Sequence, residues 1–224
     1  PGKRVMAVDA VEKAYGPNYL RLGIGLSSDF SGETYFIALA GHRMTWLNSL
    51  GAEFRTDLQL GFDNSLRMEF YQPLSVEGRF FVAPRVELSQ QRVNLYKGED
   101  RLAVYNIGER LAAVDFGVQF GQYGVLRLGL EGGRLIPRLD TGPSVIDPSD
   151  VSYARGAVAA GLSFDQLDNV NFSRQGWSAN MSLYRSNTDL GADASYTKWL
   201  VSGSLVHSFG ENTVRFNARA GGKM

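Results

Sequence analysis

The chain has 224 residues, of which 44% are hydrophobic, 12% aromatic and 21% charged, and this composition excludes an extensively disordered protein. Its 23 Lys and Arg balance its 23 Asp and Glu, so it lacks the basic surplus with which proteins bind nucleic acid. No apolar run approaches the roughly 18–20 residues of a membrane-spanning helix, and the absence of Cys excludes disulfides and thiolate metal sites.

Apolar residues recur at every second position along the chain, which is the period of a β-strand. Between 52 and 60, for example, the even positions are apolar or threonine, whereas Glu53, Arg55 and Asp57 occupy the alternate positions. The pattern predicts an all-β protein of about eleven strands. We expect these strands at 19–28, 34–46, 52–61, 65–73, 79–90, 109–120, 125–134, 152–164, 176–186, 194–208 and 213–221.

The predicted strands are longer than the usual five or six residues and match the roughly 9–11 residues of a tilted strand that crosses a membrane. Every second connection is predicted to be a tight turn, at 48–51, 75–78, 121–124 and 209–212, and long loops are expected at 91–108 and 135–150. Such an alternation is typical of transmembrane β-barrels. Three connections depart from it: 29–32 and 62–65 are short although they fall on the long-loop side, and 165–175 is long on the short-turn side. An antiparallel meander in a soluble domain is the alternative.

Two stretches of the sequence carry recognisable motifs, residues 12–23, with Gly16 and Pro17, and residues 164–176. Both resemble the BamA-type outer-membrane barrel superfamily, the bacterial surface antigen family, and the first resembles the start of its barrel. Residues 164–176 resemble a turn of the superfamily with the pattern Asp-x-x-Asp-x-x-x-Phe-Pro-x-x-Gly, although Ser173 stands where proline is usual. The residues that match this turn are Asp165, Asp168, Phe172 and Gly176. Within the superfamily, the chain is most similar to the barrel of bacterial patatin-like phospholipases.

The resemblance implies an antiparallel transmembrane β-barrel of about 16 strands, located in the outer membrane of Gram-negative bacteria and preceded by periplasmic POTRA modules. On this interpretation 1–16 are the end of a periplasmic linker or POTRA region, and 17–224 are the first eleven strands of an incomplete barrel. The superfamily's Arg-Gly-Phe or Arg-Gly-Tyr loop motif would follow the last predicted strand, where the sequence reads Gly222-Lys223-Met224.

Three functions are compatible with this interpretation of the sequence. The first is an outer-membrane barrel that anchors, and translocates, a passenger such as an upstream patatin-like lipase domain. The second is an outer-membrane protein insertase or a two-partner secretion pore of the same superfamily. The third is a soluble β-sandwich or lipocalin-like binding module. For a barrel, the expected partners are outer-membrane lipid and, at the open edges, the remaining strands or another chain, including a homodimer.

No residue pattern indicates an enzyme within this fragment. No serine lies in the Gly-x-Ser-x-Gly elbow of patatin chemistry, so a lipase domain would lie upstream. His42 and His207 fall within predicted strands and are interpreted as lumen or interface residues rather than as general bases of a barrel enzyme. Asp165 and Asp168 suit acid–base chemistry or Ca²⁺ binding, but the turn-forming interpretation is preferred. We expect no cofactor and no metal.

The polar positions of the strands carry charges of both signs. In a soluble sandwich these side chains would face bulk water, whereas in a barrel they would line the lumen and pair across neighbouring strands, at roughly 0.2–1 kcal/mol for each pair. Mixed signs favour a hydrated and braced interior over an ion-selective pore. The predicted lumen charges are Glu53, Arg55, Asp57, Arg67, Glu69, Arg85, Glu87, Arg127, Glu131, Arg215 and Arg219.

Overall fold

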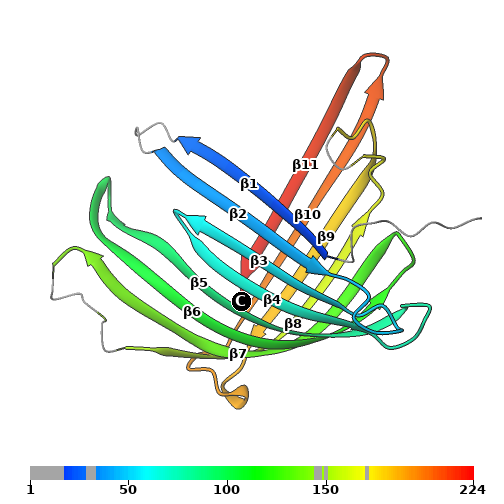
Figure 1. Cartoon of the computed structure of the whole chain (residues 1–224). Helices are drawn as coiled ribbons and strands as arrows, with labels where there is room; N and C mark the ends of the chain where they lie inside the picture. The colour runs from blue at the N-terminus through cyan, green and yellow to red at the C-terminus, as the bar shows by residue number, and fades with distance from the viewer. Residues whose placement is uncertain (1–17, 29–33, 144–147, 149–150, 170–171) are drawn as a thin grey trace, which may run out of the picture.

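The fold is a single antiparallel sheet in which each strand pairs with the next strand along the chain. The computed structural model describes residues 18–28, 34–143, 148, 151–169 and 172–224. The sheet curves into a trough (Figure 1). Its eleven strands are β1 (Asn18–Ser28), β2 (Thr34–Met44), β3 (Glu53–Gly61), β4 (Asn64–Pro73), β5 (Phe80–Lys97), β6 (Asp100–Gln119), β7 (Gly124–Thr141), β8 (Tyr153–Asp165), β9 (Gln175–Ser186), β10 (Tyr196–Phe209) and β11 (Asn212–Lys223).

The predicted all-β fold and the predicted number of strands are confirmed, whereas the predicted long loop at 91–108 is wrong and the one at 135–150 begins later than predicted, since β7 and β8 are joined through 142–152. Strand β5 continues to Lys97 and β6 begins at Asp100, so most of 91–108 is a tight hairpin that turns at Gly98, where φ is 65°. Strand β7 likewise continues to Thr141, well into the predicted 135–150 loop. These extensions carry polar residues on both faces, so the apolar alternation that marks a strand fades although the ladder continues.

The connections define two ends of the sheet, which we name the turn end and the loop end. The turn end holds the connections at 45–52, 74–79, 120–123, 166–174 and 210–211, and the loop end holds the others. The contrast in length between the two ends is irregular, as predicted for 62–65, because β3 and β4 are joined at the loop end through 62–63 alone. Strand β1 begins at the turn end, since Asn18 pairs with Met44 just before the β2–β3 connection.

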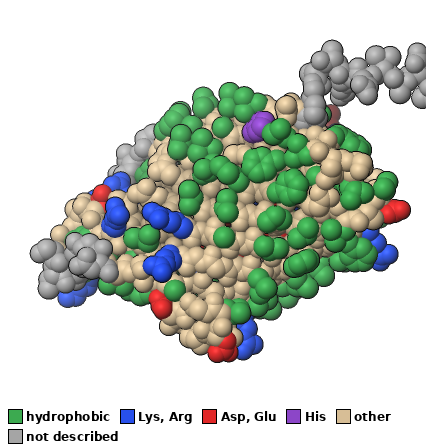
Figure 2. Space-filling view, turned by 60° about the horizontal axis from the view of Figure 1, so that its bottom comes forward, with side chains coloured by type: hydrophobic (Ala, Val, Ile, Leu, Met, Phe, Trp, Pro, Cys, Tyr) green, Lys and Arg blue, Asp and Glu red, His purple; other side chains and the backbone are tan. Residues whose placement is uncertain are grey.

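Side chains alternate between the two faces of each strand, and the pairing register carries each face across the sheet. Leu58 pairs with Leu66, and Leu66 pairs with Leu88, so apolar side chains continue across β3, β4 and β5 on one face. This face is convex, and apolar side chains are spread over much of it (Figure 2). Many of its residues are exposed, including Leu22, Ile24, Phe36, Leu88, Phe116, Leu128, Leu130, Met181, Leu205 and Phe216.

The concave face carries most of the ion pairs of the sheet, together with a small aromatic cluster towards the turn end. Tyr71 and Phe81 pack with ring centroids 4.7 Å apart, and Phe81 is only 1% exposed. The Phe81 ring lies directly over Gly117 of β6, where an added Cβ would come within 1.9 Å of it. Glycine at this position therefore leaves room for the tip of the Phe81 ring, which occupies the space that a Cβ would take. One helical turn, η2 (Thr188–Leu190), follows β9 at the loop end.

Candidate functional site: an ion-pair network on the concave face

Glu69 of β4 accepts hydrogen bonds from three arginines of the concave face, and its side chain is only 5% exposed. One oxygen accepts from Arg55 at 3.1 Å and the other from Arg67 at 3.0 Å. Arg127 of β7 donates to both oxygens, at 2.8 and 3.2 Å. A carboxylate with three guanidinium partners compensates the cost of removing these charges from water, which an isolated buried charge does not achieve.

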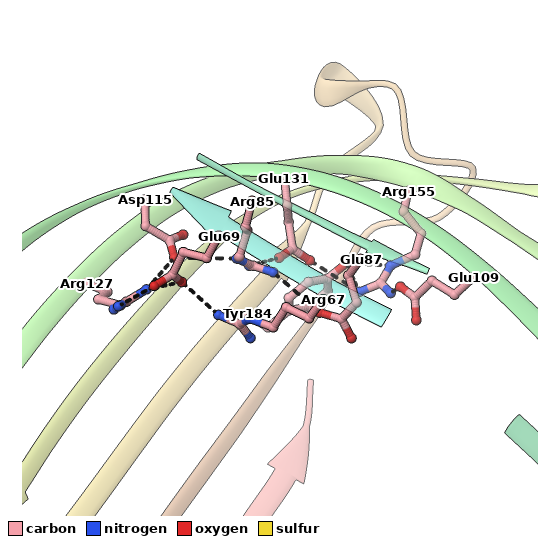
Figure 3. Close-up of polar contacts among 10 residues, drawn as sticks. All are labelled: Arg67, Glu69, Arg85, Glu87, Glu109, Asp115, Arg127, Glu131, Arg155 and Tyr184. Carbon is pink, nitrogen blue, oxygen red and sulfur yellow. Dashed lines mark hydrogen bonds and ion pairs between the residues drawn. The ribbon is translucent and has the colours of Figure 1, made fainter. Parts of the chain in front are cut away.

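The same network continues across β5, β6 and β7 (Figure 3). Arg127 also contacts Asp115 of β6 at 3.3 Å, and Asp115 lies 3.4 Å from the Nε of Arg85. Arg85 then donates to Glu131 at 3.0 Å. Acidic and basic groups therefore alternate along an unbroken path through the middle of the sheet.

Arg155 of β8 ends this path on the side of β9. It donates to Glu131 at 3.3 Å and to the hydroxyl of Tyr184 at 3.0 Å, and it pairs with Glu109. The path from Arg55 to Tyr184 thus joins side chains from every strand between β3 and β9.

Aromatic rings support three of these guanidinium groups, one of which is Arg155, 5.2 Å from the centroid of Tyr184. Arg55 lies 4.7 Å from the centroid of Tyr71, and Arg127 lies 5.1 Å from that of Phe81. Gln119 donates to the Tyr71 hydroxyl at 2.5 Å, which fixes that ring. Such contacts favour cations that are partly removed from water. The aromatic cluster therefore helps to keep Arg55 and Arg127 within hydrogen-bonding distance of Glu69.

The network includes contacts between strands that are not neighbours. Glu69 and Arg127 lie on β4 and β7, with two strands between them, and the curvature of the sheet brings them together. By contrast, Arg67 lies directly opposite Glu87 in the register but contacts Glu69 of its own strand. The expectation that charges pair across adjacent strands therefore describes only part of the arrangement, of which Arg55 with Glu69 is an example.

The other predicted charges lie at different places on the same face. Glu53 contacts Arg55 at 2.8 Å, and Glu87 lies 3.8 Å from Arg85. Asp57 lines a small pocket between β1, β2 and β3. Arg215 and Arg219 lie on β11, opposite Val206 and Ser202, and are exposed. Neither of these two arginines forms an ion pair with any residue that the structure describes.

Four members of the network were not among the predicted lumen charges: Asp115, Glu109, Arg155 and Tyr184. Asp115 occupies a polar position between apolar neighbours in the sequence, so alternation alone was a usable signal for it. Glu109 and Arg155 lie near the limits of the predicted strands, where the phase of the pattern is hardest to assign. Every carboxylate of the network contacts a guanidinium, an arrangement that suits a structural brace better than a general base.

The superfamily-like turn at 166–174 is organised by its acidic side chains. Asp165 accepts from the N–H of Leu167 at 3.0 Å, and Asp168 accepts from those of Arg174 and Gln175 at 2.9 and 3.2 Å. The Arg174 hydrogen bond, with that of Gln175, lowers the pKa of Asp168 below its ordinary value. Gly176 has φ of 115°, a conformation that favours glycine.

The remaining motif residues have different environments. The side chain of Phe172 is 86% exposed. Ser173, which stands in the place of the usual proline, is buried and donates to the carbonyl of Asn169 at 2.5 Å. Gly16 and Pro17 lie outside the described residues.

The two histidines lie far apart in the order of the strands. His42 is in β2, opposite Leu20, and His207 is in β10, opposite Val214, so the register places both on the convex face. The described part of the chain holds no group of three or more His, Cys, Asp or Glu able to bind a metal. It also holds no helix long and apolar enough to cross a membrane.

Comparison with known proteins agrees with this architecture. Residues 47–224 match the family model of the Omp85 superfamily domain, and the chain therefore belongs to the Omp85 superfamily. It is an outer-membrane β-barrel domain with a BamA-like fold. No curated protein matches the sequence.

Among solved structures, the chain is similar to BamA from Haemophilus ducreyi lacking POTRA domains 1–3, with a TM-score of 0.73 and 14% sequence identity. The match covers 93% of this chain and 41% of that BamA chain. The chain thus spans less than half the length of the protein that it resembles, and its sheet is open where a whole barrel would close.

Proposed function

We propose that this domain anchors a passenger in the outer membrane of a Gram-negative bacterium and translocates it, and that the passenger is a patatin-like lipase domain. The separation of the two faces carries the proposal. The convex face exposes leucine, isoleucine and phenylalanine, which suits contact with lipid, whereas the concave face is held by arginine–carboxylate contacts. The resemblance of the sequence to patatin-associated barrels supports the choice of passenger.

The charges of the concave face would line the lumen of this barrel. Both signs are present and most of them are paired, which favours a braced and hydrated passage over an ion-selective pore. Arg215 and Arg219, which extend the polar face to β11, would contribute unpaired positive charge near the side where the barrel closes.

Two features of the sheet bear on what surrounds it. Strands β1 and β11 each pair on one side only, and unpaired backbone groups in lipid are costly. We therefore propose that further strands cover these edges, from the same polypeptide or from another chain such as a second copy. Because β1 begins at the turn end, 1–16 would lie on the periplasmic side, as the end of a linker or POTRA region.

The second candidate is an insertase or a two-partner secretion pore. Its support is the likeness to BamA and the character of β1, where Gly23 and Gly25 pair with Leu39 and Ile37 at the edge of the sheet. Glycine weakens strand pairing, and a weak edge suits a barrel that opens beside its first strand.

Expression of the complete gene in a Gram-negative host separates these functions. For an anchored lipase, we expect ester hydrolysis in the outer-membrane fraction that is lost when protease is added to intact cells. Rescue of barrel assembly in cells depleted of their own insertase, without hydrolase activity, would favour the second candidate. Recovery of the intact protein in the soluble fraction would contradict both and leave a soluble binding module.

A further inference from the structure

The convex face changes from apolar to mixed polar and apolar at the same level on three neighbouring strands. Its unbroken run of apolar or small residues ends, towards the loop end, at Leu88 on β5, Ala112 on β6 and Gly132 on β7. The next residue of the same face is Gln90, Arg110 and Arg134, respectively. In a transmembrane barrel the apolar band is about 25 Å tall, so the side chains just beyond it lie at the level of the lipid headgroups.

Three arginines are concentrated at this border without acidic partners. Arg110 pairs directly with Arg134 in the β6–β7 register, and Arg138 lies four residues further along the same face of β7. All three are exposed, and none forms an ion pair with a residue that the structure describes. Like charges that are directly opposite each other in a sheet destabilise it, so this placement is unfavourable unless an anion lies between them.

The nearest acidic side chain of this face is already occupied. Asp140 accepts from Arg92 at 2.9 Å and from Asn106 at 3.1 Å, so both carboxylate oxygens have partners. Figure 2 shows Lys and Arg side chains gathered on the convex face on the side where the long strands β5–β7 end. The positive charge therefore remains uncompensated within the described part of the chain.

A hollow lies beside these arginines. Gly108 provides no side chain between Gln90 and Ile136, and a cavity of about 280 Å³ opens there. Arg110 and Arg138 line it together with Leu88, Ile136 and Glu109, whose carboxylate pairs with Arg155. Cationic and aliphatic side chains side by side match the boundary of a lipid, where a charged headgroup meets the acyl chains.

We propose that Arg110, Arg134 and Arg138 form a binding site for the phosphate groups of an anionic lipid in the membrane leaflet at the loop end. Arginine suits this ligand because its guanidinium binds phosphate oxygens in a bidentate manner. A phosphate between Arg110 and Arg134 removes their repulsion, and the acyl chains continue along the apolar side chains below. The site rests on the outer-membrane placement of the sheet and is independent of the passenger.

The test uses the intact protein in nanodiscs of a zwitterionic lipid that contain increasing amounts of diphosphorylated lipid A, with bound lipid A counted by native mass spectrometry. The double variant Arg110→Gln/Arg134→Gln removes two of the three charges. The matched control, Arg215→Gln/Arg219→Gln, removes two exposed arginines of the concave face. At about a factor of five per arginine near a charged surface, we expect the first variant to weaken lipid A binding about 30-fold. We expect the control to bind as the wild type does.

Two further arms identify the source of the phosphate. Lipid A from which both phosphates have been removed should bind the wild type as weakly as it binds the double variant, and millimolar inorganic phosphate should not displace intact lipid A. Equal binding by the two double variants, retained binding of the dephosphorylated lipid, or displacement by free phosphate would each overturn the site. Failure of the wild type to fold into any lipid bilayer would instead count against the membrane placement.

Discussion

At the scale of single residues, Glu69 is the carboxylate that joins the largest number of arginines in the concave network. It accepts hydrogen bonds from arginines of β3, β4 and β7, and no other carboxylate of the network contacts three guanidinium groups within 3.2 Å. Replacing it with a neutral isostere leaves those arginines close together without the charge that holds them. The free energy of unfolding should therefore fall by more than it does when one exposed ion pair is removed.

For Glu69→Gln we expect the free energy of unfolding to fall by about 3 kcal/mol, the range for breaking a buried ion pair from one side. The measurement is urea-induced unfolding of the intact protein in lipid vesicles, followed by tryptophan fluorescence. Glu87→Gln is the control, since Glu87 is 30% exposed and lies 3.8 Å from Arg85. Its loss should cost less than about 1 kcal/mol, and equal losses would show that the network is no more than a set of surface pairs.

Gly117 presents a steric rather than an electrostatic requirement. An alanine there would place its Cβ within 1.9 Å of the Phe81 ring, so the ring would have to leave its site. We expect Gly117→Ala to destabilise the protein by about 1–3 kcal/mol, measured by the same unfolding experiment. Gly161→Ala is the control, because nothing lies within 4 Å of its added Cβ. Partial recovery in Gly117→Ala/Phe81→Leu would identify the ring as the cause.

At the scale of elements, the turn between β8 and β9 depends on an ionised carboxylate. The hydrogen bonds from the N–H groups of Arg174 and Gln175 favour the charged form of Asp168 and lower its pKa below its ordinary value. A lowered pKa stabilises the fold above the pKa of the unfolded chain. This stabilisation is present at neutral pH and is lost as the pH falls through the folded-state value.

We therefore expect the Asp168 carboxyl carbon to titrate below the ordinary range of an aspartate in an NMR experiment on the folded protein. Asp168→Asn should reduce the amide-exchange protection of Arg174 and Gln175 at neutral pH, because the neutral amide is a weaker acceptor. Asp100→Asn, in the hairpin at the opposite end, should leave that protection unchanged. A titration at or above the ordinary value would contradict the role assigned to these hydrogen bonds.

The elements show how far the sequence determines this structure. The strand positions from β1 to β4 follow from the alternation of apolar residues, because one face there contacts a different environment from the other. The extensions of β5, β6 and β7 could not be predicted in this way, because Arg92, Asn106 and Arg138 place polar groups on the face that is apolar lower down. The contact of Glu69 with Arg127 could not be predicted either, since it depends on the curvature of the whole sheet.

At the scale of the whole molecule, the convex face determines whether lipid or water surrounds the sheet. If it faces lipid, a charge at its centre is costly, at about 2–4 kcal/mol for arginine. We expect Leu128→Arg to lower the folded fraction on refolding into lipid vesicles accordingly, measured by the shift of the folded band in semi-native electrophoresis. Ser182→Arg, on an exposed concave position, is the control. Equal folding of the two variants would mean that water, not lipid, covers the convex face.

The reach of the concave network has a mechanical consequence. Its contacts cross-brace the strands from β3 to β9, while β1 and β11 contribute no side chain to it within the described ranges. The sheet should therefore have unequal bending stiffness, with a rigid central plate and two compliant margins. Any deformation imposed on the wall of the barrel, by membrane tension or by a chain that threads through it, would then be concentrated along the margins and not at its centre.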